Sequence, residues 1–241
     1  NGATWSAPVD AAPLIEGYDD TFVSGPGIGI QLKSGRLVVP GYAGLFDNDT
    51  KSGMRSRVIY SDDGGAHWTM GAPVPVFSDE SQAVELCDGT VMLNMRADMG
   101  TGCRGVALSR DGGASWADFY WDYPLNECPC QASILRYGRA EQDGKNRLLF
   151  SNPDNRGESF GYLERTRMTV RLSEDEGKTW PVKKLLHAGP SSYSCLVRLP
   201  DGDIGILFEG GEKHRREWIR FGRFSLDWLT GDKKGDRPQT K

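Results

Sequence analysis

A short turn motif, S-x-D-x-G-x-x-W, occurs three times in this chain and constrains its fold more than any other feature. The copies are Ser61–Trp68 (SDDGGAHW), Ser109–Trp116 (SRDGGASW) and Ser173–Trp180 (SEDEGKTW), and the opening NGATW matches the end of a fourth. Aspartate and glycine supply the side-chain hydrogen bonds and positive φ angles of a tight hairpin. Each copy therefore predicts a turn with a tryptophan packed beneath it.

A longer unit repeats around these turns. Each complete motif follows a strand-like run, and a hairpin precedes each run. The hairpins are Gly29–Leu32/Arg36–Gly41, Gln82–Leu86/Thr90–Arg96, Ser133–Tyr137/Arg147–Ser151 and Ser194–Leu199/Asp203–Glu209, the last followed by a third strand at Glu217–Phe224 without a motif. Hairpin, third strand, turn and fourth strand form one β-propeller blade.

The repeat and the composition predict an all-β chain. A β-sandwich with repeated turns is the competing arrangement, but four repetitions of one ordered unit favour a propeller. The 31 glycines and seven tryptophans suit short strands joined by tight turns. We expect about four complete blades over residues 1–228, followed by a polar C-terminal tail over 229–241.

Charge and cysteine content exclude several classes of function. The net charge of −4 argues against a nucleic-acid partner, and no apolar run approaches the roughly 18 residues that would span a bilayer. The segment Cys128-Pro129-Cys130 offers two thiols with no nearby histidine or second cysteine pair, so we expect no metal site and no cofactor. Asn48-Asp49-Thr50 matches a glycosylation sequon, a match that is common by chance.

Strand order places a candidate site on the face opposite the repeated turns. In an up-and-down blade, the start of strand one, the end of strand two and the start of strand three share one face. Loops from several blades converge there, and propeller sites usually lie at such a mouth. The residues that this order brings to the mouth are Glu80, Arg96, Arg165, Tyr193 and Glu209. Any one of them alone would more often be a solvated ion pair or a packed aromatic.

The same residues carry a resemblance to a known family. The repeated motif is the Asp-box of sialidases, although several other propellers also contain it. Matching stretches occur in the family's order from residue 1 to 209: Ser24–Gly44, Asp79–Arg96, Cys130–Tyr137, Leu148–Pro153, Arg165–Trp180 and Gly189–Leu196. The chain therefore resembles bacterial and lysosomal-type exo-α-sialidases. This resemblance implies a six-bladed propeller that removes terminal sialic acid from glycoproteins, glycolipids or oligosaccharides with retention of configuration.

The resemblance implies a role for each site residue. Arg96 and Arg165 resemble the second and third members of an arginine triad, Tyr193 the nucleophile and Glu80 its partner carboxylate. Glu209 resembles the glutamate that orients the first arginine.

The chemistry of the residues agrees with these roles. Arginine forks suit the carboxylate of sialic acid. That carboxylate would repel an ionised nucleophile, whereas a phenol is neutral until a base takes its proton. Flanking arginines should help the phenol to lose its proton.

Two parts of the family's site have no counterpart in this sequence. The first triad arginine and the aspartate acid/base would lie in the first blade, so we expect roughly one and a half blades to precede Asn1. Localisation is unreadable for the same reason, with secreted, periplasmic or lysosomal location favoured by analogy. A trans-sialidase, a non-catalytic sialic-acid-binding propeller and a structural Asp-box propeller stay open as alternatives, as does linkage preference.

Overall fold

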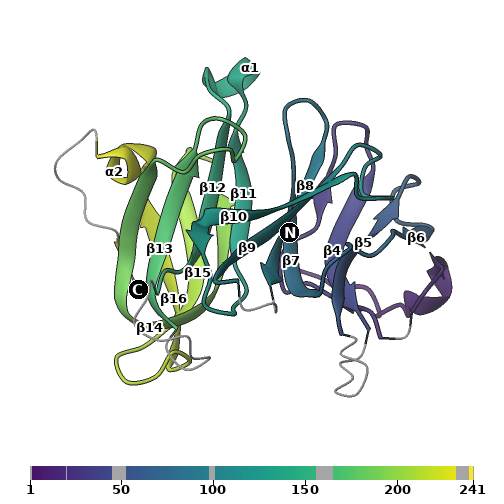
Figure 1. Cartoon of the computed structure of the whole chain (residues 1–241), viewed down its shortest axis with the longest axis horizontal. Coiled ribbons are helices and arrows are strands. Elements are labelled where there is room, and N and C mark those ends of the chain that lie inside the picture. The colour runs from purple at the N-terminus through teal and green to yellow at the C-terminus, as the bar shows by residue number, and fades with distance from the viewer. Residues whose placement is uncertain are drawn as a thin grey trace.

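The structure of the protein is a computed structural model that describes residues 2–19, 21–44, 53–97, 101–155 and 165–231 and the backbone of 239–240. Strands dominate it, and they curl into neighbouring blades (Figure 1). This confirms the expected all-β propeller with about four blades. The sequon at 48–50 and most of the tail from residue 229 lie outside the described residues.

The strands pair in the predicted blade order. In the first blade, β2 (Val23–Ser24) and β3 (Ile30–Gln31) pair with β4 (Leu37–Ala43), followed by β5 (Arg55–Ser61), β6 (Trp68–Met70) and a parallel β1 (Ile15–Glu16). The second blade contains β7 (Ser78–Glu85), β8 (Val91–Ala97), β9 (Cys103–Ser109) and β10 (Asp118–Asn126). The third contains β11 (Ser133–Gly138), β12 (Arg147–Pro153), β13 (Thr166–Ser173) and the first half of β14 (Val182–Arg198). The fourth contains the rest of β14, β15 (Ile204–Gly210), β16 (Trp218–Phe224) and β17 (Gln239–Thr240).

Helix is confined to short segments between or beside the strands. They are the 3₁₀ turn η1 (Ala12–Leu14), α1 (Ala140–Asp143) and α2 (Leu226–Thr230). Helix α1 fills the long loop of the β11–β12 hairpin and lies at the top of Figure 1.

Strand β14 is longer than the sequence indicates. We expected separate strands on either side of Tyr193, but residues 182–198 form one strand of 17 residues. Its first part pairs with β13, and its second part pairs with β15 from Ser191 onwards. The outer strand of the third blade therefore continues directly into the inner strand of the fourth.

The hydrophobic core lies between the blades. One cluster joins the first and second blades, including Val38, Val58, Leu93 and Ala107. A second cluster joins the second and third blades, including Val84, Met92, Phe150 and Trp180. A third joins the third and fourth blades, including Leu149, Val170, Ile206 and Phe208. Burial of apolar area between neighbouring sheets is therefore the main stabilising term.

The three Asp-boxes share one hydrogen-bond pattern. In the second, the Ser109 hydroxyl donates to Asp111 at 2.7 Å and accepts from the Gly113 N–H at 2.7 Å, while Asp111 accepts from the Ser115 N–H at 2.9 Å. The fourth position of each box has positive φ, and it is glycine in two boxes and Glu176, with φ 63°, in the third. The motif thus specifies the turn through local side-chain-to-backbone bonds.

Two Asp-box tryptophans connect their turn to the preceding blade. Trp116 Nε1 donates to the carbonyl of Ala72 at 2.8 Å, and Trp180 Nε1 donates to Asp122 Oδ2 in β10 at 3.2 Å. Trp68 instead bonds within its own turn, to the Gly65 carbonyl at 3.1 Å. Trp5, in the opening NGATW, is 88% exposed and lacks the expected packing.

The Asp122 carboxyl makes stability depend on pH. Burial raises its pKa to about 6, although hydrogen bonds from Trp180 and the Leu125 N–H and the charge of Arg171 lower it in part. In the unfolded chain the carboxyl titrates near its reference value of about 3.9. The folded state therefore holds the proton more tightly, so the free energy of unfolding falls as pH rises from about 4 to about 6.

We expect Asp122→Asn to remove this part of the pH dependence. The difference in the free energy of unfolding between variant and parent should change by at most about 3 kcal/mol between pH 4 and pH 7. Urea unfolding at several pH values measures it. Parallel stability curves for the two proteins would show that Asp122 titrates normally.

Candidate active site

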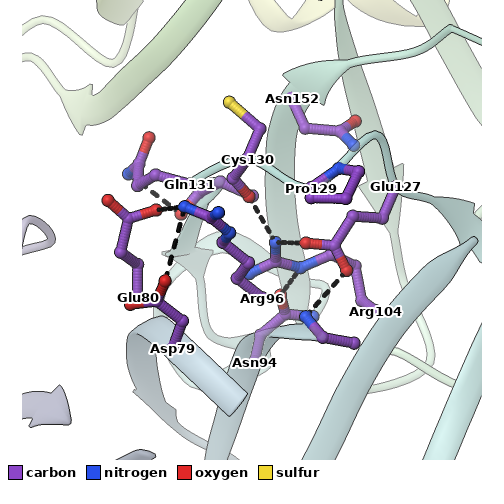
Figure 2. A network of polar contacts seen from close by, with 12 residues as sticks. Asp79, Glu80, Asn94, Arg96, Arg104, Glu127, Pro129, Cys130, Gln131 and Asn152 are labelled. Atoms are coloured by element: carbon purple, nitrogen blue, oxygen red, sulfur yellow. Dashed lines mark hydrogen bonds and ion pairs between the residues drawn. The ribbon is translucent and has the colours of Figure 1, made fainter. Parts of the chain in front are cut away.

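All five side chains that strand order brought to the mouth lie together in the structure. Glu80 is the centre of the group. One of its carboxylate oxygens accepts a hydrogen bond from the Tyr193 hydroxyl, and the other lies 2.9 Å from Arg96 Nη1. Asp79 is the second carboxylate beside Arg96, at 3.5 Å (Figure 2). A phenol, its hydrogen-bonded carboxylate and a guanidinium thus form one contiguous cluster.

Strand irregularities aim the two central residues. Glu80 and Tyr193 lie inside β7 and β14, rather than before these strands as expected. Each lies within a shift of the pairing register. Glu80 lies between Ser78 and Ser81 of β7, and Tyr193 lies between Ser191 and Ser194 of β14. Such bulges leave residues out of the ladder and re-aim their side chains. The inner strands of two blades therefore present their side chains to each other across the mouth.

The Tyr193 phenol is neutral at rest. Burial raises its pKa above the ordinary value, and the hydrogen bond to Glu80 and the Glu80 charge raise it further. Arg96 lowers the pKa, but this effect is the smaller one. The expected help from flanking arginines is therefore present but outweighed. The phenol has to give up its proton to Glu80 during a reaction rather than before it.

Arg165 lies against Tyr193 and is held by backbone and side-chain acceptors. Its guanidinium carbon is 5.7 Å from the centre of the Tyr193 ring. One terminal nitrogen donates to the Ser192 hydroxyl at 3.0 Å, and the other donates to the Pro129 carbonyl at 2.5 Å. Arg165 is only 7% exposed, so its position is fixed before any ligand binds.

Glu209 completes the group from β15. It accepts a hydrogen bond from the Tyr193 backbone N–H at 3.4 Å and lies 4.0 Å from Arg216 Nε. The side chain of Glu209 is 30% exposed. The carboxylate therefore has a cation nearby within the described residues, which sequence reasoning did not anticipate.

A buried ion pair beneath the site was missed from the sequence. Arg104 in β9 is fully buried and bonds Glu127 Oε1, Asn94 Oδ1 and the Cys130 carbonyl, each at 2.8 Å (Figure 2). Glu127 also accepts from the Ala97 N–H at 3.0 Å. Together these contacts hold residues 127–130, whose Pro129 carbonyl binds Arg165. The available signal was a lone arginine inside an otherwise apolar strand, CRGVALS.

Gln131 holds β14 beside the phenol. Its side-chain amide donates to the Ser194 carbonyl at 2.8 Å and accepts from the Ser194 N–H at 2.8 Å. This paired bond links the segment after Cys130 to the residue after Tyr193. The segment 127–131 therefore supports both Arg165 and the strand that carries Tyr193.

The remaining chemistry-bearing groups do not form a second centre of this kind. None of the five cysteines forms a disulfide, and burial raises the pKa of Cys130 to about 12 and that of Cys128 to about 11. Within the described ranges, no three histidine, cysteine or acidic side chains gather to hold a metal ion. No helix among those residues is long and apolar enough to cross a membrane.

Comparison with known proteins agrees with the fold. Residues 1–206 match the family described as BNR repeat-like domain. The chain is 37% identical over 243 residues to a sialidase of Micromonospora viridifaciens, covering 95% of this chain and 34% of that protein. It is 30% identical over 287 residues to human sialidase-3, covering 98% of this chain and 65% of that protein.

Solved structures give the same result. The Hadza microbial sialidase Hz136 superposes with a TM-score of 0.80 at 33% identity, covering 95% of this chain and 42% of the other. A leech intramolecular trans-sialidase superposes with a TM-score of 0.67 at 28% identity, covering 88% of this chain and 33% of the other. The fold is that of a sialidase-type propeller. The chain belongs to the family described as BNR repeat-like domain, is similar to sialidases, and spans about a third of the length of the first curated relatives it matches.

Breaking the buried pair should destabilise the protein strongly. We expect Glu127→Leu to lower the free energy of unfolding by about 3–5 kcal/mol because it leaves Arg104 charged and unpaired. Adding Arg104→Met should recover only part of the loss, since the Ala97 N–H and the Cys130 carbonyl stay without these partners. Denaturant unfolding and hydrogen exchange of 127–131 measure both effects.

An exposed ion pair provides the matched control. Lys145 lies 2.7 Å from Glu174, with side chains 58% and 37% exposed, and Lys145→Ala should change stability by less than about 1 kcal/mol. Equal losses in Glu127→Leu and Lys145→Ala would contradict the importance of the buried pair.

Proposed function

We propose that this chain carries the nucleophile and two arginines of an exo-α-sialidase site that acts on terminal, α-ketosidically linked sialic acid. The contact between the Tyr193 hydroxyl and the Glu80 carboxylate is the observation that carries the proposal. A structural propeller has no use for a half-buried phenol aimed at a carboxylate. Sialylated glycoproteins, glycolipids and oligosaccharides are the corresponding substrates.

The arginines suit the ligand. Sialic acid carries a carboxylate on its anomeric carbon, and planar guanidinium groups bind carboxylates through two parallel hydrogen bonds. Arg165 is fixed and lies against the Tyr193 ring, whereas Arg96 now lies against Glu80 and Asp79. A substrate carboxylate beside Arg96 would place the anomeric carbon close to the phenol oxygen.

The geometry supports a two-step displacement. Glu80 takes the Tyr193 proton as the phenol oxygen bonds to the anomeric carbon, and the glycosidic carbon–oxygen bond breaks as the aglycone oxygen keeps the electron pair and takes a proton from the acid/base aspartate that the resemblance implies. Water then attacks the same carbon and gives a proton back to that aspartate, the tyrosyl ether bond breaks, and the phenol recovers its proton from Glu80. Two displacements at one carbon retain its configuration. A neutral phenol avoids the repulsion that a carboxylate nucleophile would meet from the substrate carboxylate.

Transfer to an acceptor other than water is the second candidate function. A Macrobdella decora relative named anhydrosialidase is 30% identical over 269 residues, and the similar leech structure is an intramolecular trans-sialidase. In such a reaction a hydroxyl replaces water in the second step, at the same tyrosyl intermediate. Analysis of the released sugar separates free sialic acid from an intramolecular or transferred product.

Tyr193→Phe tests the nucleophile in the full-length protein. The variant should bind a 2,3-unsaturated sialic acid analogue within a few-fold of the parent, because the arginine contacts remain. Turnover of a fluorogenic sialoside should fall by about 10³-fold or more, because the covalent route is lost. Activity within a few-fold of the parent would exclude Tyr193, and an inactive parent that still binds would favour a non-catalytic sialic-acid-binding propeller.

Residues 1–241 alone should hydrolyse no sialoside at a useful rate. The family's first arginine and its aspartate acid/base have no match in this sequence, and general acid catalysis is typically worth about 10²–10⁴ in rate. The fourth blade also presents Val197, Leu207, Ile219 and Phe221, which are 38–78% exposed. A contiguous apolar surface of this kind favours association. A monodisperse monomer of these residues that turns over a fluorogenic sialoside would contradict this expectation.

A further inference from the structure

A large cleft lies on the side of the second blade away from the mouth. It has a volume of about 710 Å³, within the range of small-ligand sites. The turn between β7 and β8 lines it, whereas Glu80 lies near the other end of β7. The six steps along the chain from Glu80 to Leu86 span roughly 20 Å of extended backbone. The cleft is therefore separate from the candidate active site.

The cleft has one aromatic wall, an apolar floor and a polar wall. Tyr120 and Tyr123 of β10 supply the rings of the aromatic wall, whereas the Trp121 ring packs against Phe119 on the other face of the sheet. Leu86, Met92 and Leu108 form the floor. The third Asp-box forms the opposite wall with residues 176–178. This combination of aromatic faces with polar groups at the margins is typical of sites that bind amphipathic small ligands.

The most exposed aromatic residue of this cleft, Tyr123, lies where β10 leaves the ladder with β9. Asp122 pairs with Arg104 and Asn126 pairs with Cys103, so residues 123–125 have no partner in β9. Tyr123 is 69% exposed there, and it borders both this cleft and a neighbouring cavity of about 480 Å³. The core does not require a tyrosine at this position. The bulge instead places the Tyr123 ring between the cleft and the neighbouring cavity.

A buried carboxyl group supplies a hydrogen-bonding atom at the base of the aromatic wall. Asp122 lines the cleft and is only 6% exposed, with Trp180 Nε1 bonded to its Oδ2 at 3.2 Å. Asp88 lies at the margin of the cleft. Glu176 already accepts from Arg136 and from the Cys87 N–H. Carboxylates accept hydrogen bonds from hydroxyl groups.

We propose that this cleft binds an uncharged pyranose, such as a galactose-type sugar of a glycan chain. A pyranose has a C–H face that packs on a tyrosine ring and hydroxyls that donate to Asp122 and Asp88. The proposal goes beyond the active site and does not depend on catalysis there.

Charge and backbone features disfavour other ligands. Asp88 and Asp122 line the cleft together with Glu176, which is paired with Arg136, and the lining cations are Lys178 and Arg110, which pairs with Asp118 at 3.0 Å. An anionic sugar would therefore meet repulsion, without the paired arginines that bind a carboxylate. A peptide added as a strand along the edge of β10 would meet Pro124, which has no N–H to donate.

A second sugar contact would increase retention on multivalent glycans. When one glycan branch occupies this cleft, other branches of the same surface stay at high effective concentration near the mouth. Binding of the neutral sugars that underlie sialic acid would thus become stronger after desialylation exposes them. The cleft would keep the protein on a surface that still carries substrate.

The test is binding of lactose and methyl β-galactopyranoside to the full-length protein, measured by saturation-transfer NMR and calorimetry. We expect saturable binding with Kd on the order of 1 mM. Tyr123→Ala should weaken it at least about tenfold, whereas Tyr123→Phe should retain it because the ring remains. The exposed position of Tyr123 lets both variants fold, and thermal unfolding checks this.

Two further variants distinguish this site from others. Tyr18→Ala removes a tyrosine of the first blade that is 41% exposed, and it should leave binding unchanged. Tyr193→Phe should also leave it unchanged, whatever that variant does to sialoside turnover. Absence of saturable binding up to about 50 mM lactose, some 50 times the expected Kd, would overturn the proposal. An equal loss of lactose binding in Tyr18→Ala and Tyr123→Ala would also overturn it. So would displacement of bound lactose by free sialic acid.

Discussion

Contact between neighbouring blades is the constraint on which the rest of this structure depends. A single twisted sheet has two faces, and a blade can bury them only against the sheets on either side. The three hydrophobic clusters accordingly lie between blades rather than within one blade. Polar contacts reinforce the same boundaries. Arg36 donates to the Asp111 carbonyl across the first boundary, and Glu176 accepts from Cys87 across the second. The second and third Asp-box turns thus contribute to the position of two blades.

That rigidity lets distant parts of the chain form one small site. Glu80 and Tyr193 are separated by 113 residues, yet their side chains meet without a ligand to draw them together. Bulges at equivalent places on two inner strands aim them at each other. Beneath them, the Arg104–Glu127 pair supports the segment that binds Arg165 and β14. Pre-organisation of this kind places the functional groups before substrate arrives, so little binding energy is lost in ordering them.

The mouth could be predicted from the sequence because blade order alone determines which strand ends share a face. Glu80, Arg96, Arg165, Tyr193 and Glu209 were found by that rule, and the structure brings all five together. Arg104 and Glu127 were missed because their importance comes from burial and from partners in other strands, which periodicity does not reveal. The expected effect of arginine on the Tyr193 pKa is present, but the net rise of that pKa was not foreseen. Nearby arginines are visible in a sequence, but the stronger effects of desolvation and of the Glu80 hydrogen bond depend on three-dimensional distances. The continuity of β14 likewise depends on pairing with two different neighbours.

Strand β14 has a consequence for how this part of the molecule opens and closes. Because one strand runs through both blades, a displacement of the part that pairs with β13 is passed along the backbone to the part that pairs with β15. We therefore expect the third and fourth blades to open together. Tyr193 lies at the junction, between Pro190, which pairs with β13, and Ser194, which pairs with β15. The position of the phenol is protected against partial unfolding to a degree that a residue on a terminal loop could not reach.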